Sequence, residues 1–254
     1  MCRLYGFISE VAGSAQYPLL DAKNCLMHQA SHARISGEIG RFGTHNDGCG
    51  IAWQEENSIK LVIRDKDVVW DSGFRDIVSG LATPGFIAHN RRATGGLRIG
   101  SALSHPFSGS VGSTPVAFCH NGTVFSLLPE AKKRGITDSE VFFERLVEKT
   151  EELSTSSLSN FLASCSASLE FSSLNAMILS SDALYVWRYI DDSSPKAAMY
   201  DWYYCLSMQV GSGSVTFASE PVDNALDWEP VANRTLISIT RQSGEGLAVS
   251  TSRF

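Results

Sequence analysis

Residues 137–149 of the chain have the sequence TDSEVFFERLVEK, which predicts a helix between two strand-rich halves. The first four residues match the S/T-x-x-E capping box, in which the side chains of Thr137 and Glu140 bond the free backbone N–H groups of a helix start. From residue 141 onward, apolar residues recur at helical spacing. We therefore expect a helix that begins near Asp138.

A second helix is expected directly after the first one. Residues 154–173 are rich in serine and resemble a linker in composition, but Leu158, Leu162, Cys165 and Leu169 recur within them at intervals of three or four. This apolar spacing favours a helix over a domain boundary.

On both sides of these two helices the sequence predicts short strands and a sandwich of sheets. Runs rich in β-forming residues, bounded by Gly, Ser, Asp or Pro, occur at 4–9, 50–54, 60–64, 85–89, 176–180, 183–189, 202–209, 214–219 and 235–240. Helical spacing at 18–33 and 74–81 adds two helices to the first half, and Ser180-Ser181-Asp182 predicts a hairpin turn. The pattern favours the α+β class, with stacked sheets covered by helices.

Composition narrows the class of protein further. The 254 residues include 21 Lys and Arg and 27 Asp and Glu, a net charge of −6, which argues against nucleic-acid binding through bulk positive charge. With 43% hydrophobic residues a packed core is expected. Six scattered cysteines without a CxxC pair favour a reduced, cytoplasmic protein, and we expect neither a signal peptide nor a membrane-spanning segment.

Cys2 is the first candidate for chemistry. Removal of Met1 would expose a cysteine whose own α-amine lies a few bonds from its thiol, so that nucleophile and base belong to one residue. An α-amine titrates at about pH 8 and a thiol at about pH 8.5, so both reactive forms are populated at neutral pH. Taken alone, a cysteine after the initiator is more often incidental than functional.

Two further segments each allow two interpretations. Residues 89–96, HNRRATGG, place Arg91 at a glycine-containing turn, where its planar fork suits a carboxylate, although a solvated arginine pair would have the same sequence. In Cys119-His120-Asn121-Gly122, the Asn side chain and the Gly backbone N–H can form an oxyanion hole. Asn-Gly is also a strong hairpin signal. No second Cys/His pair at ligand spacing supports zinc.

The remaining candidates are explained equally well by local structure. Asp138 at the expected helix start can bind an ammonium group or simply favour the helix dipole. His105 before Pro106, and residues 45–50 (HNDGCG) before a strand, can also be turn residues and nothing more.

Six segments in succession resemble the class II glutamine amidotransferases, a family of the N-terminal-nucleophile hydrolases. They are MCRLYGF at 1–7, NDGCGIAW at 46–53, AHNRRATGG at 88–96, SHPF at 104–107, CHNGTVF at 119–125 and TDSEVFFERL at 137–146. The strand at 218–221 followed by Trp228 extends the resemblance to small stand-alone members, so that it covers nearly the whole chain.

The resemblance implies a fold and a set of roles. The fold is a four-layer αββα sandwich, formed by residues 1–254 as one domain. Cys2 is then the nucleophile, with its α-amine as general base, and Asn121 with Gly122 forms the oxyanion hole. Arg91 holds the α-carboxylate of glutamine and Asp138 its α-ammonium group. Thr94 and His105 are supporting residues near the glutamine pocket.

The resemblance leaves the reaction partner open. It implies hydrolysis of the γ-amide of glutamine with release of ammonia, without a metal or organic cofactor, and a separate enzyme that accepts the ammonia. Arg92 and Gly95 depart from the aromatic residue and histidine of the synthase-linked members, so a longer or anionic γ-substituent could be admitted. The alternatives are a γ-glutamyl amide hydrolase acting on a larger compound and, less favoured, a non-catalytic γ-glutamyl-binding regulatory module.

Overall fold

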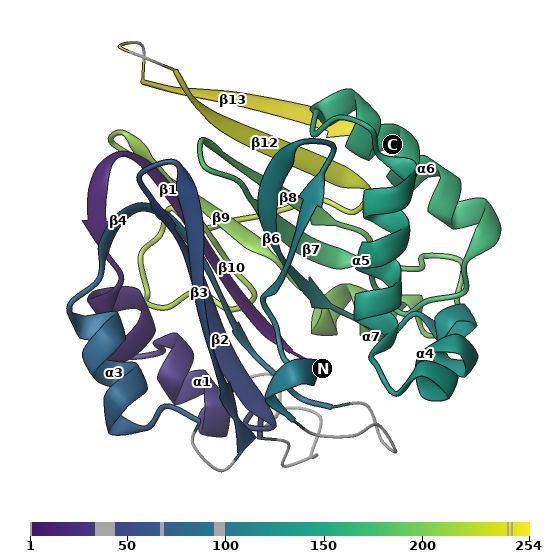
Figure 1. Ribbon diagram of the computed structural model, residues 1–254, viewed down its shortest axis with the longest axis horizontal. Coiled ribbons are helices and arrows are strands. Elements are labelled where there is room, and N and C mark those ends of the chain that lie inside the picture. Colours follow the sequence, from purple (N-terminus) through teal and green to yellow (C-terminus); the bar gives the residue numbers. More distant parts are fainter. Residues whose placement is uncertain (1, 34–43, 67–68, 94–99, 243, 245) are drawn as a thin grey trace.

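The structure is a computed structural model of the 254-residue chain. It describes all residues except 1, 34–43, 67–68, 94–99, 243 and 245. Two stacked sheets form its centre, and helices cover their outer faces (Figure 1).

The first sheet has seven strands in the described part of the chain, in the order β11-β9-β10-β1-β4-β2-β3. All of its strand pairs are antiparallel, and β1 is the middle strand. The strands are β1 (Arg3–Ser14), β2 (Gly48–Glu55), β3 (Ser58–Asp65), β4 (Ala82–Asn90), β9 (Ser207–Gly211), β10 (Ser214–Ala218) and β11 (Glu229–Pro230).

The second sheet has six strands among the described residues, in the order β13-β12-β8-β7-β6-β5, and is also antiparallel throughout. Its strands are β5 (Phe107–Val111), β6 (Thr114–Asn121), β7 (Asn175–Leu179), β8 (Ala183–Arg188), β12 (Thr235–Gln242) and β13 (Gly246–Arg253). Residues 180–182 form the predicted turn between β7 and β8.

The helices form the two outer layers. The first sheet carries the π-helical turn η1 (Tyr17–Asp21), α1 (Leu26–His32) and α3 (Ser72–Ser79), whereas the second carries α4 (Leu128–Arg134), α5 (Asp138–Lys149) and α6 (Thr155–Ser168) (Figure 1). The short 3₁₀ turns are η3 (Ser101–Leu103) and η4 (Phe125–Leu127), and α7 (Ala197–Tyr203) follows β8.

Apolar side chains fill the three spaces between these four layers. The layer between the two sheets contains Leu4 and Ile8 from β1 and Ala117 and Cys119 from β6. The other two clusters lie between each sheet and its helices. The predicted αββα sandwich is therefore confirmed.

The capping box determines where α5 begins. The Thr137 hydroxyl accepts a hydrogen bond from the Glu140 N–H at 3.0 Å, and the helix starts at Asp138 as expected. The serine-rich segment forms α6, with Ser154 as its N-cap. The first prediction came from capping chemistry and the second from apolar spacing, and a sequence displays both signals directly.

Other expected elements differ from the structure. The helix expected at 18–33 is divided into η1 and α1. The backbone is extended at Ala22, and the Cys25 thiol then caps the start of a new helix. The strand expected at 202–209 is wrong over its first half. There α7 ends at Tyr203, and the tyrosines of this segment pack on one another in a small buried cluster instead of alternating across a sheet.

Asn121-Gly122 is not a hairpin turn. Asn121 ends β6, and the chain then continues into η4 and three helices before it returns as β7. The hairpin interpretation of this dipeptide is therefore wrong, and its conformation needs another explanation.

Candidate active site

Cys2 and Asn121 meet between the two sheets at one end of the sandwich. Cys2 directly precedes β1, and its backbone N lies 2.9 Å from Oδ1 of Asn121, the last residue of β6. Both residues are buried, Cys2 with 7% of its surface exposed and Asn121 with none. Two residues that are distant in sequence thus become direct neighbours.

The side-chain amide of Asn121 also carries a hydrogen-bond donor, its Nδ2 group. Its Nδ2 group is buried and has no hydrogen-bond partner among the described residues, while its Oδ1 accepts from Cys2. A buried N–H donor without an acceptor is costly, so such groups are rare outside functional sites. Here the donor belongs to the same amide that contacts Cys2.

Gly122 is required for packing. A Cβ atom at this position would lie 1.8 Å from the backbone oxygen of Ser173 and 3.0 Å from Nε2 of His120. Because the closest atom belongs to the backbone, it cannot move aside as a side chain would. Any larger residue at 122 would displace the end of β6.

Arg91 leaves the end of β4 in a turn that is tied to the chain before β2. Its backbone N–H donates to the Gly48 carbonyl at 2.8 Å, and its carbonyl accepts from the Asp47 N–H at 3.0 Å. The Asp47 carboxylate accepts from the Ala93 N–H at 2.8 Å. Arg91 itself is 3% exposed, so the predicted solvated arginine pair is wrong for this residue.

Asp138 is a buried carboxylate at the start of α5. Its Oδ2 accepts a hydrogen bond from the Val124 N–H at 2.8 Å. Burial raises its pKa above the usual value, against the lowering effects of the backbone N–H groups and of the Arg91 charge. Asp138 and Arg91 therefore lie close enough to interact electrostatically, although Asp138 begins α5 and Arg91 follows β4 of the first sheet.

Buried histidines surround these groups. The rings of His105 and His89 lie 4.3 Å apart between centroids, and none of their four ring nitrogens has a hydrogen-bond partner in the described part of the chain. Burial lowers the pKa of His89 to about 3 and that of His105 well below its ordinary value. His120 is held by Ser139 and by the Ser173 carbonyl, and burial lowers its pKa to about 4. These rings are therefore neutral at physiological pH.

The structure thus brings together six of the seven expected site residues. Cys2, Arg91, His105, Asn121, Gly122 and Asp138 lie at the same end of the sandwich, whereas Thr94 lies outside the described residues. The Arg92 carbonyl lies 3.9 Å from the Cys2 thiol, and Gly95 is again outside the described part. His89 was not singled out from the sequence; it lies in β4, whose last six residues are all buried.

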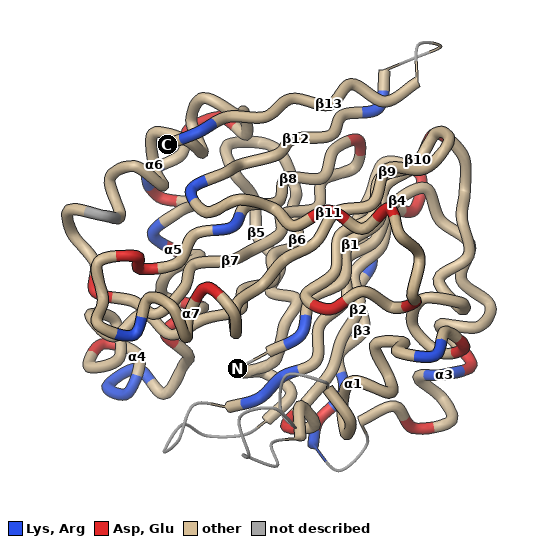
Figure 2. The backbone as a smooth tube through the Cα atoms, turned by 180° about the vertical axis from the view of Figure 1, so that it is seen from behind, with Lys and Arg blue, Asp and Glu red and all other residues tan. Residues whose placement is uncertain are grey.

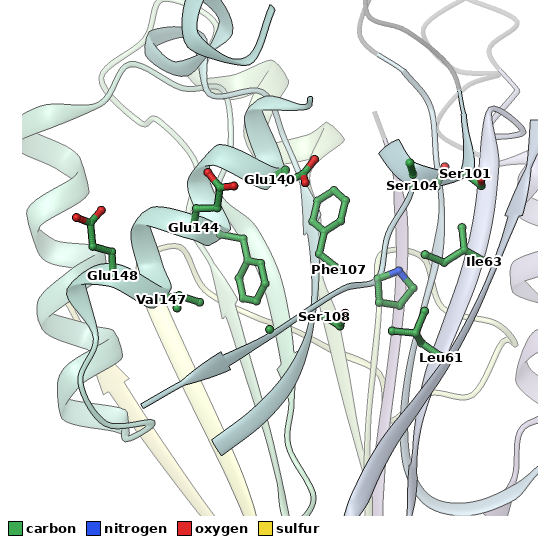
Figure 3. A pocket seen from close by; sticks show the side chains of 14 residues that line it. Leu61, Ile63, Ser101, Ser104, Phe107, Ser108, Glu140, Glu144, Val147 and Glu148 are labelled. Carbon is green, nitrogen blue, oxygen red and sulfur yellow. The ribbon is translucent and has the colours of Figure 1, made fainter. Parts of the chain in front are cut away.

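A separate groove lies beside this site (Figure 3). It has a volume of about 500 Å³ and runs between α5 and β3, with Leu61, Phe107 and Val147 among its apolar lining. Three carboxylates, those of Glu140, Glu144 and Glu148, also line the α5 side of the groove. Neither Cys2 nor Asn121 lines it, so the groove is a neighbour of the candidate active site and not the site itself.

Charged residues of both signs lie near the start of β1, where Figure 2 shows Lys and Arg as well as Asp and Glu positions close to the N-terminal end of the chain. Within the described residues, no three His, Cys, Asp or Glu side chains are grouped so that they could hold a metal ion. In the same part of the chain, no helix has the length and apolar character needed to span a bilayer.

Comparisons with known proteins agree with the fold. The family model described as "Glutamine amidotransferases class-II" matches residues 21–193, more than half of the chain. No curated protein matches the chain in sequence.

Solved structures with this fold share little sequence with the chain. The glutamine phosphoribosylpyrophosphate amidotransferase of B. subtilis superposes with a TM-score of 0.63 at 17% identity, over 99% of this chain but 49% of its own. A glutamine aminotransferase class-II domain protein from Silicibacter pomeroyi gives 0.64 at 19% identity and is covered over 99% of its length, against 100% of this chain. A predicted glutamine amidotransferase from Pseudomonas aeruginosa gives 0.55 at 18%, over 93% of this chain and 96% of its own.

The fold is thus that of the N-terminal-nucleophile hydrolases, with two antiparallel sheets between helical layers. Within that class, the chain belongs to the class II glutamine amidotransferase family. Its length is close to that of the small family proteins, and it spans about half the length of the phosphoribosylpyrophosphate enzyme.

The raised pKa of Asp138 predicts an effect on stability. Because the fold favours the neutral acid, the ionised carboxylate destabilises the protein at neutral pH, and this cost disappears as the pH falls below the folded-state pKa. Asp138→Asn should therefore have a melting temperature at pH 7 equal to or above that of the wild type, with a difference that shrinks toward about pH 4.

Thermal unfolding of both proteins from pH 4 to pH 8 measures this difference. Asp71→Asn is the matched control, because it changes a helix-capping carboxylate that is 37% exposed, and we expect no gain from it. An Asp138→Asn protein that is less stable than the wild type at pH 7, with parity restored at pH 4, would contradict the prediction.

Proposed function

We propose that the protein is a cysteine amidohydrolase that cleaves the γ-amide of glutamine and releases ammonia. The observation that carries this proposal is the contact between Cys2 and Asn121, in which one amide bonds the backbone N of Cys2 and also keeps a buried N–H donor without a partner. Membership in the class II glutamine amidotransferase family supports it.

The proposed reaction has two halves. With Met1 removed, the free α-amine of Cys2 takes the thiol proton, and the thiolate attacks the γ-carbonyl carbon of glutamine. The carbonyl oxygen becomes negative, and Asn121 Nδ2 and the Gly122 N–H donate to it. The protonated amine then gives its proton to the leaving nitrogen, so that ammonia departs and a thioester remains. Water, deprotonated by the same amine, cleaves the thioester to glutamate and restores the thiol.

The substrate head is held by two opposite charges in this proposal. Arg91 binds the α-carboxylate in a two-pronged contact and Asp138 binds the α-ammonium group. The burial of both residues supports these roles, because a charged group bound there is shielded from water. Thr94 and His105 are proposed as supporting residues of the pocket.

The proposal extends to the whole chain and its partners. We infer that residues 1–254 act as one amidotransferase-type domain in the cytoplasm. Transfer of the released ammonia then requires a separate acceptor enzyme. No metal or organic cofactor enters the proposed steps.

A larger γ-glutamyl compound is the second candidate substrate. It is favoured by Arg92, a cationic residue whose backbone carbonyl lies 3.9 Å from the Cys2 thiol. A γ-substituent with an anionic group could pair with this side chain, which glutamine itself cannot do.

The nucleophile is tested with protein whose N-terminus has been verified by intact mass. Cys2→Ala should abolish release of ammonia from glutamine while the melting temperature is retained, and Cys2→Ser should keep only a small residual activity because a hydroxyl is hardly ionised at neutral pH. Full activity in Cys2→Ala, or in protein that retains Met1, would refute the mechanism.

The roles of Asn121 and Asp138 predict changes in different kinetic parameters, kcat for Asn121 and KM for Asp138. Asn121→Ala should lower kcat by on the order of a hundredfold with little effect on KM, because the oxyanion forms only during the reaction. Asp138→Asn should raise KM by roughly tenfold to a hundredfold, because it removes a charge-assisted contact to the bound head group. Steady-state ammonia release measures both variants, and an unchanged kcat in Asn121→Ala would contradict the oxyanion role.

The two substrate candidates are separated by a panel of γ-glutamyl amides of increasing size and charge. If Arg92 contacts the γ-substituent, bulky anionic amides should react at least as fast as glutamine, and Arg92→Gln should remove that advantage without affecting glutamine. Cleavage of glutamine alone, with no competition from the larger amides, would leave ammonia release from glutamine as the function.

A further inference from the structure

Arg3, the residue after the candidate nucleophile, is a charged side chain with no exposed surface. Its Nη1 donates a hydrogen bond to the backbone carbonyl of Cys2 at 2.9 Å. Its Nε lies 2.9 Å from Oε1 of Glu220, and its Cζ lies 5.4 Å from the ring centre of Tyr203. The carboxylate and the aromatic face thus compensate a buried cation that also donates to the backbone of Cys2.

Glu220 is itself fixed to the same strand. It follows β10, and its neighbour Ser219 bonds Leu4 of β1 twice: the Leu4 N–H donates to the Ser219 hydroxyl at 3.0 Å, and the Ser219 N–H donates to the Leu4 carbonyl at 2.9 Å. Glu220 is 4% exposed. The carboxylate is therefore held directly beside the start of β1.

Cys2 has particular need of such contacts. The strand pairing of β1 with β4 begins at Arg3, opposite Asn90, so Cys2 lies just outside the ladder. After removal of Met1 it also has only one covalent neighbour. Its backbone N is held by Asn121 and its carbonyl by Arg3, so that side-chain contacts at both ends replace the missing ladder bonds.

We infer that Arg3 and Glu220 form a buried positioning pair, which holds Cys2 in the orientation needed for attack. The inference rests on the proposed function, and both residues act through Cys2 without touching the substrate. Stability alone explains the pair poorly, because taking two charges out of water often costs as much as their attraction returns. Apolar residues of similar volume would fill the same space.

The test is Arg3→Lys, which keeps the charge but replaces the two-sided fork with one ammonium group. That group can face Glu220 or the Cys2 carbonyl but not both in the present geometry. We expect kcat for the amide substrate to fall about tenfold to a hundredfold, since small misplacements of a reacting group have effects of this size. KM should stay within about twofold, because the substrate head binds elsewhere.

Arg188→Lys is the matched control. Arg188 is also a buried arginine that bonds backbone carbonyls, those of Tyr204 and Val231, and pairs with Asp201 at 2.8 Å, but it does not contact Cys2. The Arg188→Lys variant should lose about as much stability as Arg3→Lys and keep the kcat of the wild type. An equal fall in kcat in both variants, or an unchanged kcat in Arg3→Lys, would overturn the inference.

Glu220→Gln tests whether the carboxylate acts through Arg3. The single variant should lower kcat, and the Arg3→Lys/Glu220→Gln double variant should be no worse than Arg3→Lys alone, because the two residues serve one contact. Losses that multiply in the double variant would show independent roles and contradict a positioning pair.

A readout that needs no catalysis separates this inference from the proposed function. An N-terminal cysteine condenses with formaldehyde: the amine and the aldehyde form an imine with loss of water, and the thiol adds to the imine to close a five-membered ring. Imine formation takes the Cys2 N out of its hydrogen bond with Asn121 Oδ1, so a loosened Cys2 should react faster in Arg3→Lys than in the wild type or in Arg188→Lys.

Mass mapping of residue 2 against time measures this rate on protein with a verified N-terminal Cys2. If the wild type releases no ammonia from any γ-glutamyl amide, the proposed function fails, and ring closure still decides the positioning inference. Equal rates of closure in all three proteins would overturn it.

Discussion

The hydrogen bond from the backbone N of Cys2 to Oδ1 of Asn121 joins the two sheets at the end of the sandwich where the candidate site lies. Cys2 precedes the middle strand of one sheet, and Asn121 ends a strand of the other. The distance between them is set by the apolar layer in which Leu4, Ala117 and Cys119 pack. Because packed interiors resist small shifts, the geometry of the site is inherited from the core between the sheets.

The electrostatics of the site depend on arginines and carboxylates rather than on histidines. His89, His105 and His120 are all buried, and burial lowers the pKa of each, so they carry no charge at neutral pH. The positive charge of the site therefore comes from buried arginines, Arg3 and Arg91, and not from histidines. Asp138, whose pKa is raised by burial, is the site carboxylate through which pH changes the charge here.

Predictions from the sequence succeeded where the signal is local and failed where it is tertiary. The capping box at Thr137 located the start of α5 and with it Asp138, because both partners of the cap lie within four residues. Asn121-Gly122 was ambiguous, since a hairpin and an oxyanion hole use the same dipeptide and only the family resemblance separated them. The tyrosines of α7 suggested a strand because aromatic residues are enriched in strands. Here they instead form a small buried cluster. The pairing of Arg3 with Glu220 has no local signal, since the two residues meet only through the pairing of β1 with β10.

Two residues of the proposed oxyanion hole differ in what a substitution can reveal. At Gly122 the backbone N–H is inseparable from a steric constraint, because a Cβ atom there would collide with the Ser173 carbonyl. Loss of activity in a Gly122 variant would thus be expected whether or not its N–H meets an oxyanion. At Asn121 the two functions belong to different atoms: Oδ1 accepts from Cys2, and the buried Nδ2 donor has no partner in the described residues. Asn121 is therefore the position where the chemistry of the site can be separated from the packing that builds it.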